Sequence, residues 1–564
     1  MASLAAMAVS VERARSQSWR DLVGYTQLQS RLGGALPTGA GGVVSQVENA
    51  VTSGGAYYID SSLASFNGSL DPRGLPVTFT DGSGGASHGI SAHTSAVANR
   101  FYGDADSLAP GANNVVIYEV NHWLENILQY ATEDVPLPQN YRVQNHSWVG
   151  TMASGNRSPQ PHVEHPHNVS VLKRYDYLIE RANQGAGMTA VVGVNNNTNP
   201  LPYLLSHSYN AIAVGRTDGN HSSGLTLAPD ATPPDDSYGP GRSKPDVVAP
   251  LSSTSNATGG VSSAAALLYE ALDPVGTAPN EVVKSLLLAG ATKTEFTGWI
   301  RTPTQPLDDV FGAGELNVYN SYLMTLGGQQ PGSQSPAAAA VSPFGWDYQD
   351  FKGNASVGDV YYNFEIPAGT IADELSIALA WNAEIEDLDA SETGFLPSLA
   401  LQDLNLELYS TTSTAMTLLD QSISAVDNVE HLYLRNLSPG GYALKVTGAA
   451  DWDYGIAWRM NTRFAAPSAD FNADGVVNGG DFLIWQQNVN TLVGATRATG
   501  DGDGDGDVDL DDLNLWKTTV IATPMPLAAA AIGAVPEPAS LMIAAGLGAA
   551  PLVVAARRRP RRAA

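Results

Sequence analysis

The hydroxyl-bearing side chains of segment 252–258 are the first residues in this chain whose types and spacing suggest chemistry. They follow segment 244–250, whose two adjacent valines and closing proline are typical of a strand that ends. A helix rich in small residues is expected next. A serine at such a helix start lies near unpaired N–H groups, where anionic acyl-transfer intermediates are stabilised. The segment alone fits a nucleophile and an ordinary helix N-cap equally well.

Two acidic segments suggest a second chemistry, the binding of a hard cation. Segments 470–481 and 501–512 both follow the pattern D-x-[DN]-x-D-G-x-x-[DN]-x-x-D, and an apolar helix start follows each. Oxygens at positions 1, 3, 5, 9 and 12, with a backbone carbonyl at position 7, suit Ca²⁺. The sequence therefore predicts two calcium sites. Their expected ligands are Asp470, Asn472, Asp474, Val476, Asn478, Asp481, Asp501, Asp503, Asp505, Asp507, Asp509 and Asp512.

The pattern of strand-like and helical runs that must position these residues predicts a multidomain chain. Apolar strand-like runs alternate with helical stretches in the first half, which indicates an α/β fold with a parallel sheet covered on both faces. Six short, turn-bounded runs then indicate an antiparallel β-sandwich. We expect an N-terminal lead (1–23), an α/β domain (24–325), a linker (326–341), a sandwich domain (342–463), a small α calcium module (466–520) and a C-terminal segment with a hydrophobic helix (535–564).

Composition limits the partners. The chain has 564 residues, a net charge of −27 and no cysteine. The negative charge disfavours nucleic acid and anionic membrane surfaces, and it favours cations. Without cysteine there are no disulfides, thiolate zinc sites or cysteine nucleophiles. We expect no nucleic-acid partner.

Segment 244–268 resembles the serine motif of the subtilases, the subtilisin-like serine proteases, in which K-P-D-V-x-A-P precedes G-T-S-M-A-T-P. Ser255 falls at the nucleophile position, Thr254 and Ala257 match, and Gly259 replaces the usual proline. The resemblance implies a subtilisin-like fold and hydrolysis of polypeptide substrates. A jelly-roll-like sandwich often follows such a domain in this family.

The family order of acid, histidine and serine directs the search upstream of that motif. Segment 91–98 resembles H-G-T-x-V-A, which implies that His93 is the general base. His88, which precedes a glycine, is the alternative.

The acid has two candidates. Segment 38–51 resembles the family's aspartate strand, T-G-x-G-V-x-V-A-V-I-D-T-G-I, with Glu48 in the aspartate position. Asp60 lies in a segment similar to V-I-D-S-G and is the alternative acid. Either carboxylate would orient the imidazole and stabilise the imidazolium. We favour Glu48.

Two further segments resemble the rest of the family's site. Asn195 follows a run similar to V-V-x-A-A-G-N, which implies an oxyanion-hole amide. Ser147, Trp148 and Gly150 resemble the S-x-G substrate strand, to which an extended peptide would add as a β-strand.

The C-terminal segments resemble modules of exported proteins. The two calcium loops are similar to dockerin type I repeats, which implies a possible cohesin-like partner. Segment 535–538 reads VPEP and is followed by an apolar run and RRRPRR, as in PEP-CTERM sorting signals. That resemblance implies recognition by an exosortase, a transient inner-membrane anchor, and export to the envelope, surface or extracellular matrix of a Gram-negative-type bacterium.

Two functions follow from these observations. The first is an exported subtilisin-like serine endopeptidase. The second is a noncatalytic surface adhesion or assembly protein on a degenerate subtilase scaffold. The retained Ser255, His93 and Asn195 favour the first, and the departures at Glu48 and Gly259 favour the second.

Overall fold

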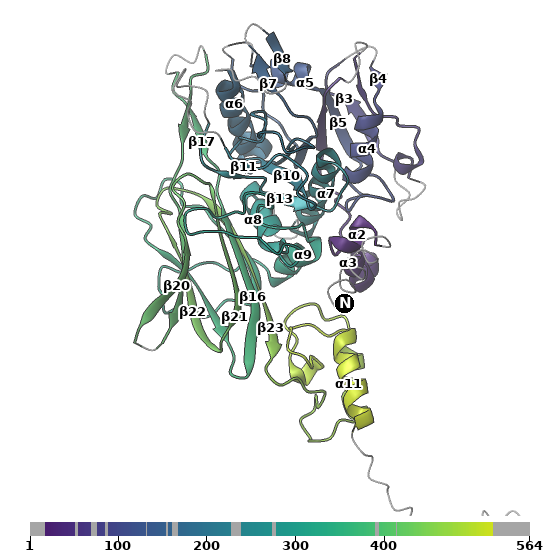
Figure 1. Ribbon diagram of the computed structural model, residues 1–564, viewed down its shortest axis with the longest axis vertical. Coiled ribbons are helices and arrows are strands. Elements are labelled where there is room, and N and C mark those ends of the chain that lie inside the picture. The colour runs from purple at the N-terminus through teal and green to yellow at the C-terminus, as the bar shows by residue number, and fades with distance from the viewer. Residues whose placement is uncertain are drawn as a thin grey trace, which may run out of the picture.

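The computed structural model has an α/β domain, a β-sandwich beside it and a small C-terminal module (Figure 1). It describes residues 17–50, 55–68, 76–84, 88–130, 132, 134–153, 156–160, 167–226, 238–272, 278–389, 394–412 and 414–522. The sorting segment predicted at 535–564 lies outside these residues. Among the residues described, no helix is long and apolar enough to span a membrane.

A seven-stranded sheet, parallel throughout, forms the centre of the α/β domain. Its middle strands are buried along their whole length, as expected when helices cover both faces. The strand order is β13 (Val247–Ala249), β10 (Ile212–Arg216), β9 (Thr189–Gly193), β6 (Val143–His146), β1 (Val44–Glu48), β5 (Asn114–Glu119) and β3 (Thr78–Asp81).

Helices cover this sheet on both faces, which confirms the predicted α/β architecture. One hydrophobic cluster joins a face of the sheet to α4, α7, α8 and α9, and a second joins the other face to α6 and the segment around Trp123. The helices are α2 (Trp19–Leu22), α3 (Tyr25–Leu32), α4 (Ala92–Phe101), α5 (Val120–His122), α6 (His167–Arg181), α7 (Thr254–Leu272), α8 (Asn280–Gly290) and α9 (Val318–Gly327).

The N-terminal boundary differs from the prediction. Trp19 and Val23, placed in the lead 1–23, are buried in the main core. The Trp19 indole N–H also donates to the Asp106 carbonyl at 3.1 Å. Tertiary burial of these apolar side chains therefore extends the α/β domain to at least α2.

Short ladders complete the α/β domain and connect it to the sandwich. The paired strands are β2 (Ala56–Tyr58) with β4 (Gly89–Ile90), β7 (Thr151–Ala153) with β8 (Asn156–Gln160), β11 (Gly224–Leu225) with β12 (Ser243–Lys244), and β17 (Glu384–Asp387) with β18 (Pro397–Ala400).

Two antiparallel four-stranded sheets form the predicted sandwich, with a hydrophobic core between them. One sheet has the order β14 (Phe344–Gln349), β23 (Tyr454–Phe464), β16 (Thr370–Ala380) and β21 (Val429–Leu437). The other has the order β15 (Val360–Ile366), β22 (Gly440–Thr447), β19 (Asn405–Thr411) and β20 (Met416–Ser422).

The sandwich and the α/β domain share one continuous interface. Trp346 and Ala378 of the sandwich belong to the same buried cluster as α8. The predicted linker 326–341 also lies along the sandwich, where Ser333 and Tyr361 exchange backbone hydrogen bonds of 3.0 and 2.7 Å. The segment between the two domains is therefore held in place along its length.

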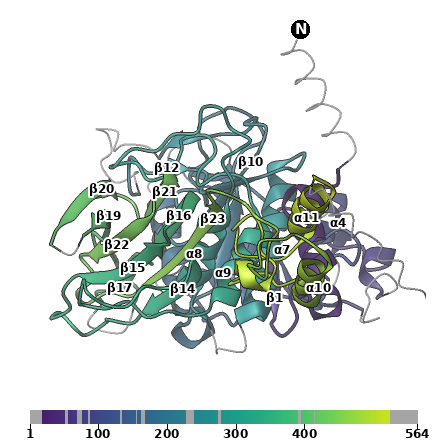
Figure 2. The same cartoon turned by 90° about the horizontal axis from the view of Figure 1, so that it is seen from below.

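The C-terminal module contains helices α10 (Gly479–Asn488) and α11 (Leu510–Ala522) around a small core that includes Phe471 and Trp485. It lies next to α3 and below α4 and α7 (Figures 1 and 2). Arg31 of α3 binds both carboxylate oxygens of Asp507, at 2.6 and 2.9 Å. This bidentate pair ties the module to the α/β domain.

Candidate active site

Ser255 lies in the first turn of α7, directly after the loop that leaves β13. The capping role falls to a neighbour, because Ser253 Oγ accepts the Asn256 N–H at 3.2 Å. Ser255 Oγ instead lies 3.1 Å from His93 Nε2. Ser253 is thus the helix cap, and the Ser255 hydroxyl is left to contact His93.

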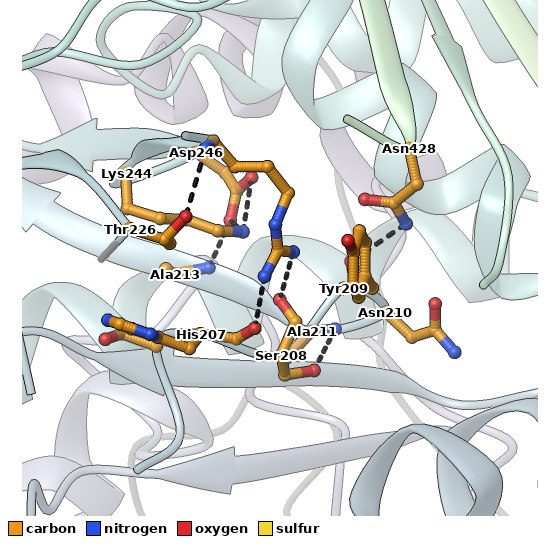
Figure 3. Close-up of polar contacts among 12 residues, drawn as sticks. His207, Ser208, Tyr209, Asn210, Ala211, Ala213, Thr226, Lys244, Asp246 and Asn428 are labelled. Atoms are coloured by element: carbon orange, nitrogen blue, oxygen red, sulfur yellow. Dashed lines mark hydrogen bonds and ion pairs between the residues drawn. The ribbon is translucent and has the colours of Figure 1, made fainter. Parts of the chain in front are cut away.

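A buried polar network supports the strand that leads to this loop (Figure 3). Lys244 Nζ lies 2.8 and 3.0 Å from the two carboxylate oxygens of Asp246, and both side chains are about 3% exposed. Asp246 Oδ2 also accepts the Ala213 N–H at 2.6 Å. Because each charge is paired within the protein, the network fixes β13 beside β10.

His93 is the second residue of α4, whose N-cap is Ser91. Ser91 Oγ accepts the Thr94 N–H at 3.2 Å, which fixes the start of the helix. The His93 ring is 39% exposed, and its Nδ1 lies 2.9 Å from Glu48 Oε2. The hydrogen bond with Glu48 is the main cause that raises the His93 pKa, and burial opposes it.

Glu48 is the last residue of β1, and its side chain is only 1% exposed. Its second oxygen, Oε1, accepts the Gln46 amide N–H at 2.7 Å. Gln46 is held in turn by the Thr94 carbonyl at 3.1 Å and by the Tyr102 hydroxyl, which donates to its Oε1 at 2.6 Å. Both oxygens of the buried carboxylate are therefore satisfied, as a charge in this position requires.

The two alternative residues lie in other interactions. Asp60 Oδ1 accepts hydrogen bonds from the N–H and hydroxyl of Ser62, at 3.1 and 2.5 Å. His88 Nδ1 lies 3.2 Å from Asp81, and its ring packs 3.7 Å from that of Tyr58. The structure brings together Glu48, His93 and Ser255, and neither alternative joins them.

A cleft of about 120 Å³ opens beside Ser255. Asn195 lines it, but its Nδ2 points toward the Pro200 carbonyl at 3.4 Å. Asn196, which also lines the cleft, accepts the Thr254 N–H through Oδ1 at 2.8 Å. Two adjacent amides thus flank the helix start, where the sequence indicated one.

The predicted substrate strand is only partly free. Ser147 lines the cleft, and its Oγ lies 3.1 Å from the Ser255 carbonyl oxygen. Trp148 also lines it but is mostly buried, with its indole N–H on His146 Nδ1 at 3.2 Å. Gly150 exchanges backbone hydrogen bonds with Leu204, at 3.2 and 2.9 Å. An added peptide strand therefore has Ser147 and Trp148 beside it, while the chain itself occupies the backbone groups of Gly150.

The predicted calcium ligands differ between the two loops. In the second loop, single carboxylate oxygens of Asp501, Asp503 and Asp512 lie within 4.8 Å of one another, and so do those of Asp507, Asp509 and Asp512. Such a gathering of oxygens fits Ca²⁺ coordination. Asp507 uses its side chain for Arg31, which leaves its backbone carbonyl for the position-7 role.

In both loops, backbone N–H groups bind the first and last aspartates, and in the second loop these are Asp501 and Asp512. The first loop has the same arrangement. Asp481 accepts from Phe471 and Asn478 at 2.8 and 2.9 Å, and Asp470 accepts from Asp474 and Gly475 at 3.1 and 2.9 Å. The remaining predicted ligands of the first loop, Asn472, Val476 and Asn478, lie in the same turn. Asp505 is the remaining predicted ligand of the second loop.

Sequence reasoning missed Gln46, Tyr102 and Asn196. Gln46 lies two residues before Glu48 on β1 and so projects to the same face of the sheet. The two-residue period of a β-strand could therefore have identified Gln46. Tyr102 and Asn196 gave none, because their roles depend on contacts across the fold.

Comparisons with known proteins give limited similarity. No family model matches the chain, and no curated protein matches it. Among solved structures, it is similar to the prenylagaramide maturation protease PagA, at 16% identity over 53% of this chain and 98% of that one, with a TM-score of 0.32. The self-cleaved protease domain of PatA gives 18% identity over 51% and 97%, with a TM-score of 0.30. The PatG macrocyclase domain gives 13% identity over 54% and 96%, with a TM-score of 0.34.

Proposed function

We propose that this protein is a serine endopeptidase of the subtilisin-like kind, with Ser255 as nucleophile, His93 as general base and Glu48 as the acid. The observation that carries the proposal is the hydrogen-bonded chain from Glu48 Oε2 to His93 Nδ1, at 2.9 Å, and from His93 Nε2 to Ser255 Oγ, at 3.1 Å. Nucleophile, base and orienting group within hydrogen-bond reach are the signature of an activated serine.

The reaction has two halves, acylation and deacylation, and Ser255, His93 and Glu48 act in both. Ser255 Oγ attacks the carbonyl carbon of the scissile peptide bond while its proton passes to His93 Nε2. The tetrahedral intermediate collapses, the C–N bond breaks, and His93 returns the proton to the leaving amine. Water, deprotonated by His93, then hydrolyses the acyl-enzyme. Glu48 holds the imidazole in the required tautomer and stabilises its positive charge.

The developing oxyanion lies at the start of α7. The Ser255 N–H belongs to the first turn, where backbone donors lack intrahelical partners. We assign the second donor to Asn195, whose present hydrogen bond to Pro200 is long and exchangeable at 3.4 Å. Rotation of this amide toward the substrate would complete the pair of donors.

A fluorophosphonate probe tests the proposal directly, because it forms a covalent bond only with an activated serine. We expect labelling at Ser255, located by peptide mapping, and its loss in Ser255→Ala and His93→Ala. Ser253→Ala is the matched control: it lies in the same loop and loses the cap at Asn256, but should still be labelled. Absence of labelling in folded protein would contradict the proposal and favour the noncatalytic surface role.

We also propose that Ca²⁺ binds the C-terminal module and that the chain is exported through its C-terminal segment. The gathered carboxylates of the second loop support the first proposal. The VPEP motif at 535–538 and the basic end support the second. Mass spectrometry of protein from the surface fraction of the native cells tests export: mature protein should lack the residues after this motif, and an intact tail there would contradict processing by an exosortase.

A further inference from the structure

A polar cavity of about 300 Å³ lies between the α/β domain and the sandwich, outside the serine site. Its walls come from α6, α8, β14, β17 and the loop residues that follow β14 and β16 and precede β23. The lining includes four carboxylates, two basic side chains and two aromatic rings. These residues are Glu180, Glu281, Glu384, Asp453, Lys352, Arg181, Tyr348 and Trp452.

The negative charges of this cavity exceed the positive ones. Arg181 pairs with Glu180 at 3.0 Å, and Lys352 pairs with Glu384 at 2.9 Å. Among the described residues, no salt bridge joins Glu281, the α8 residue that lines the cavity, to a cation. Asp453 has no salt bridge among these residues either; it accepts from the Lys352 N–H and the Tyr348 hydroxyl, at 3.0 and 3.3 Å, and shares a side-chain hydrogen bond with Asp350. Among the described residues, two carboxylates of the cavity therefore have no salt-bridge partner.

Glu281 carries the clearest sign of a missing partner. Its side chain lines the cavity although the residue is only 7% exposed. Oε1 accepts the Asn382 amide N–H at 2.7 Å, but Oε2 has no hydrogen-bond partner among the described residues. Burial raises the pKa of Glu281 to about 8 and that of Asp453 to about 6. With a pKa of about 8, Glu281 is largely protonated at pH 7, and a bound cation would offset the cost of ionising it.

The arrangement suits an organic cation better than a metal ion. In the described part of the chain, the carboxylate groups close enough to share a metal are both in the C-terminal module, and none is in this cavity. The cavity carboxylates are spread around a volume many times that of a metal ion. Tyr348 and Trp452 add aromatic walls, which attract ammonium and guanidinium groups.

We propose that this interdomain cavity binds a small guanidinium or alkylammonium compound, held by the carboxylates of Glu281 and Asp453 against Tyr348 and Trp452. The site is separate from Ser255, so the proposal stands whether or not the protein is a peptidase. Because residues of both domains line the cavity, the bound cation would also fasten the sandwich to the α/β domain.

Isothermal titration of the full chain with agmatine, which carries one guanidinium and one ammonium group, tests this proposal. We expect one binding site, with affinity reduced roughly 30-fold or more in Glu281→Gln and in Asp453→Asn, since each removes a carboxylate that pairs with the cation. Glu281→Gln can keep the hydrogen bond with Asn382, so folding should be preserved. Glu386→Gln, on the exposed side of β17 two residues from Glu384, should bind as the wild type does.

Two further measurements make the outcome decisive. Agmatine should raise the midpoint of thermal unfolding in the wild type and in Glu386→Gln, but not in Glu281→Gln. CaCl₂ should not compete with agmatine. Absence of agmatine binding, equal binding by Glu281→Gln and wild type, or displacement of agmatine by Ca²⁺ would each overturn the proposal.

Discussion

Glu48 Oε2 lies 2.9 Å from His93 Nδ1, although the carboxylate is carried by a side chain one methylene longer than aspartate. The extra length is accommodated because Gln46, on the same face of β1, holds the other oxygen at 2.7 Å. The buried carboxylate is thus fixed from two sides before it meets the imidazole.

Glu48→Gln tests this relationship in the proposed mechanism. The amide is nearly isosteric but cannot stabilise the imidazolium, so kcat should fall by about 10⁴, as in the corresponding aspartate-to-asparagine change described for a serine protease. Glu48→Asp should lose less activity, because it keeps the charge at a longer distance. Steady-state kinetics on a peptide substrate would measure both, and unchanged kcat in Glu48→Gln would exclude Glu48 as the acid.

The pH dependence should follow His93. The hydrogen bond from Glu48 raises its pKa, and the base is active only when neutral. The rise of kcat/KM with pH should therefore have its midpoint above the ordinary histidine value of about 6.5. Glu48→Gln should move that midpoint down, and a midpoint that does not move would contradict the pairing.

The same pKa shift affects stability with a definite sign. A pKa raised in the folded state stabilises the fold below the unfolded value, and this contribution is lost as pH rises through the folded value. Denaturant unfolding of the wild type and His93→Ala, compared between pH 5 and pH 9, should show their difference in stability shrinking toward pH 9. A difference that grows with pH would contradict it.

Substitutions of the two cleft amides, Asn195 and Asn196, should have different effects on catalysis and stability. Asn195→Ala should reduce kcat by about 10² to 10³ with little change in KM, because an oxyanion donor acts mainly in the transition state. Asn196→Ala should instead lower thermal stability, since its Oδ1 holds the Thr254 N–H. The reverse pattern would reassign the donor to Asn196.

Calcium should stabilise the C-terminal module through its second loop. At 100 times Kd, binding to the folded state contributes about 2.7 kcal/mol. Asp512→Asn should abolish the shift in unfolding midpoint on addition of Ca²⁺, while Asp511→Asn, the exposed neighbour outside the predicted ligand set, should keep it. Equal calcium shifts in both variants would contradict the assignment.

Much of the α/β core could be predicted from apolar runs, because buried parallel strands such as β9 are apolar along their length. Glu48 was chosen from the pattern around it, and the structure places it, and not Asp60, beside His93. The pairing of Gly150 with Leu204 and the burial of Trp19 were not predictable in this way. Both depend on segments that meet only in the folded chain.

Arg459, on β23 of the sandwich, is 1% exposed, and its guanidinium donates to the carbonyls of Ala289 and Ala291, at 2.9 and 3.3 Å, where α8 ends. The sandwich thus supplies the C-terminal cap of a core helix of its neighbour. Cutting the chain between the two domains would expose those carbonyls and an apolar face together. We therefore expect the two domains to unfold together, so that the sandwich would not be stable as an independent unit.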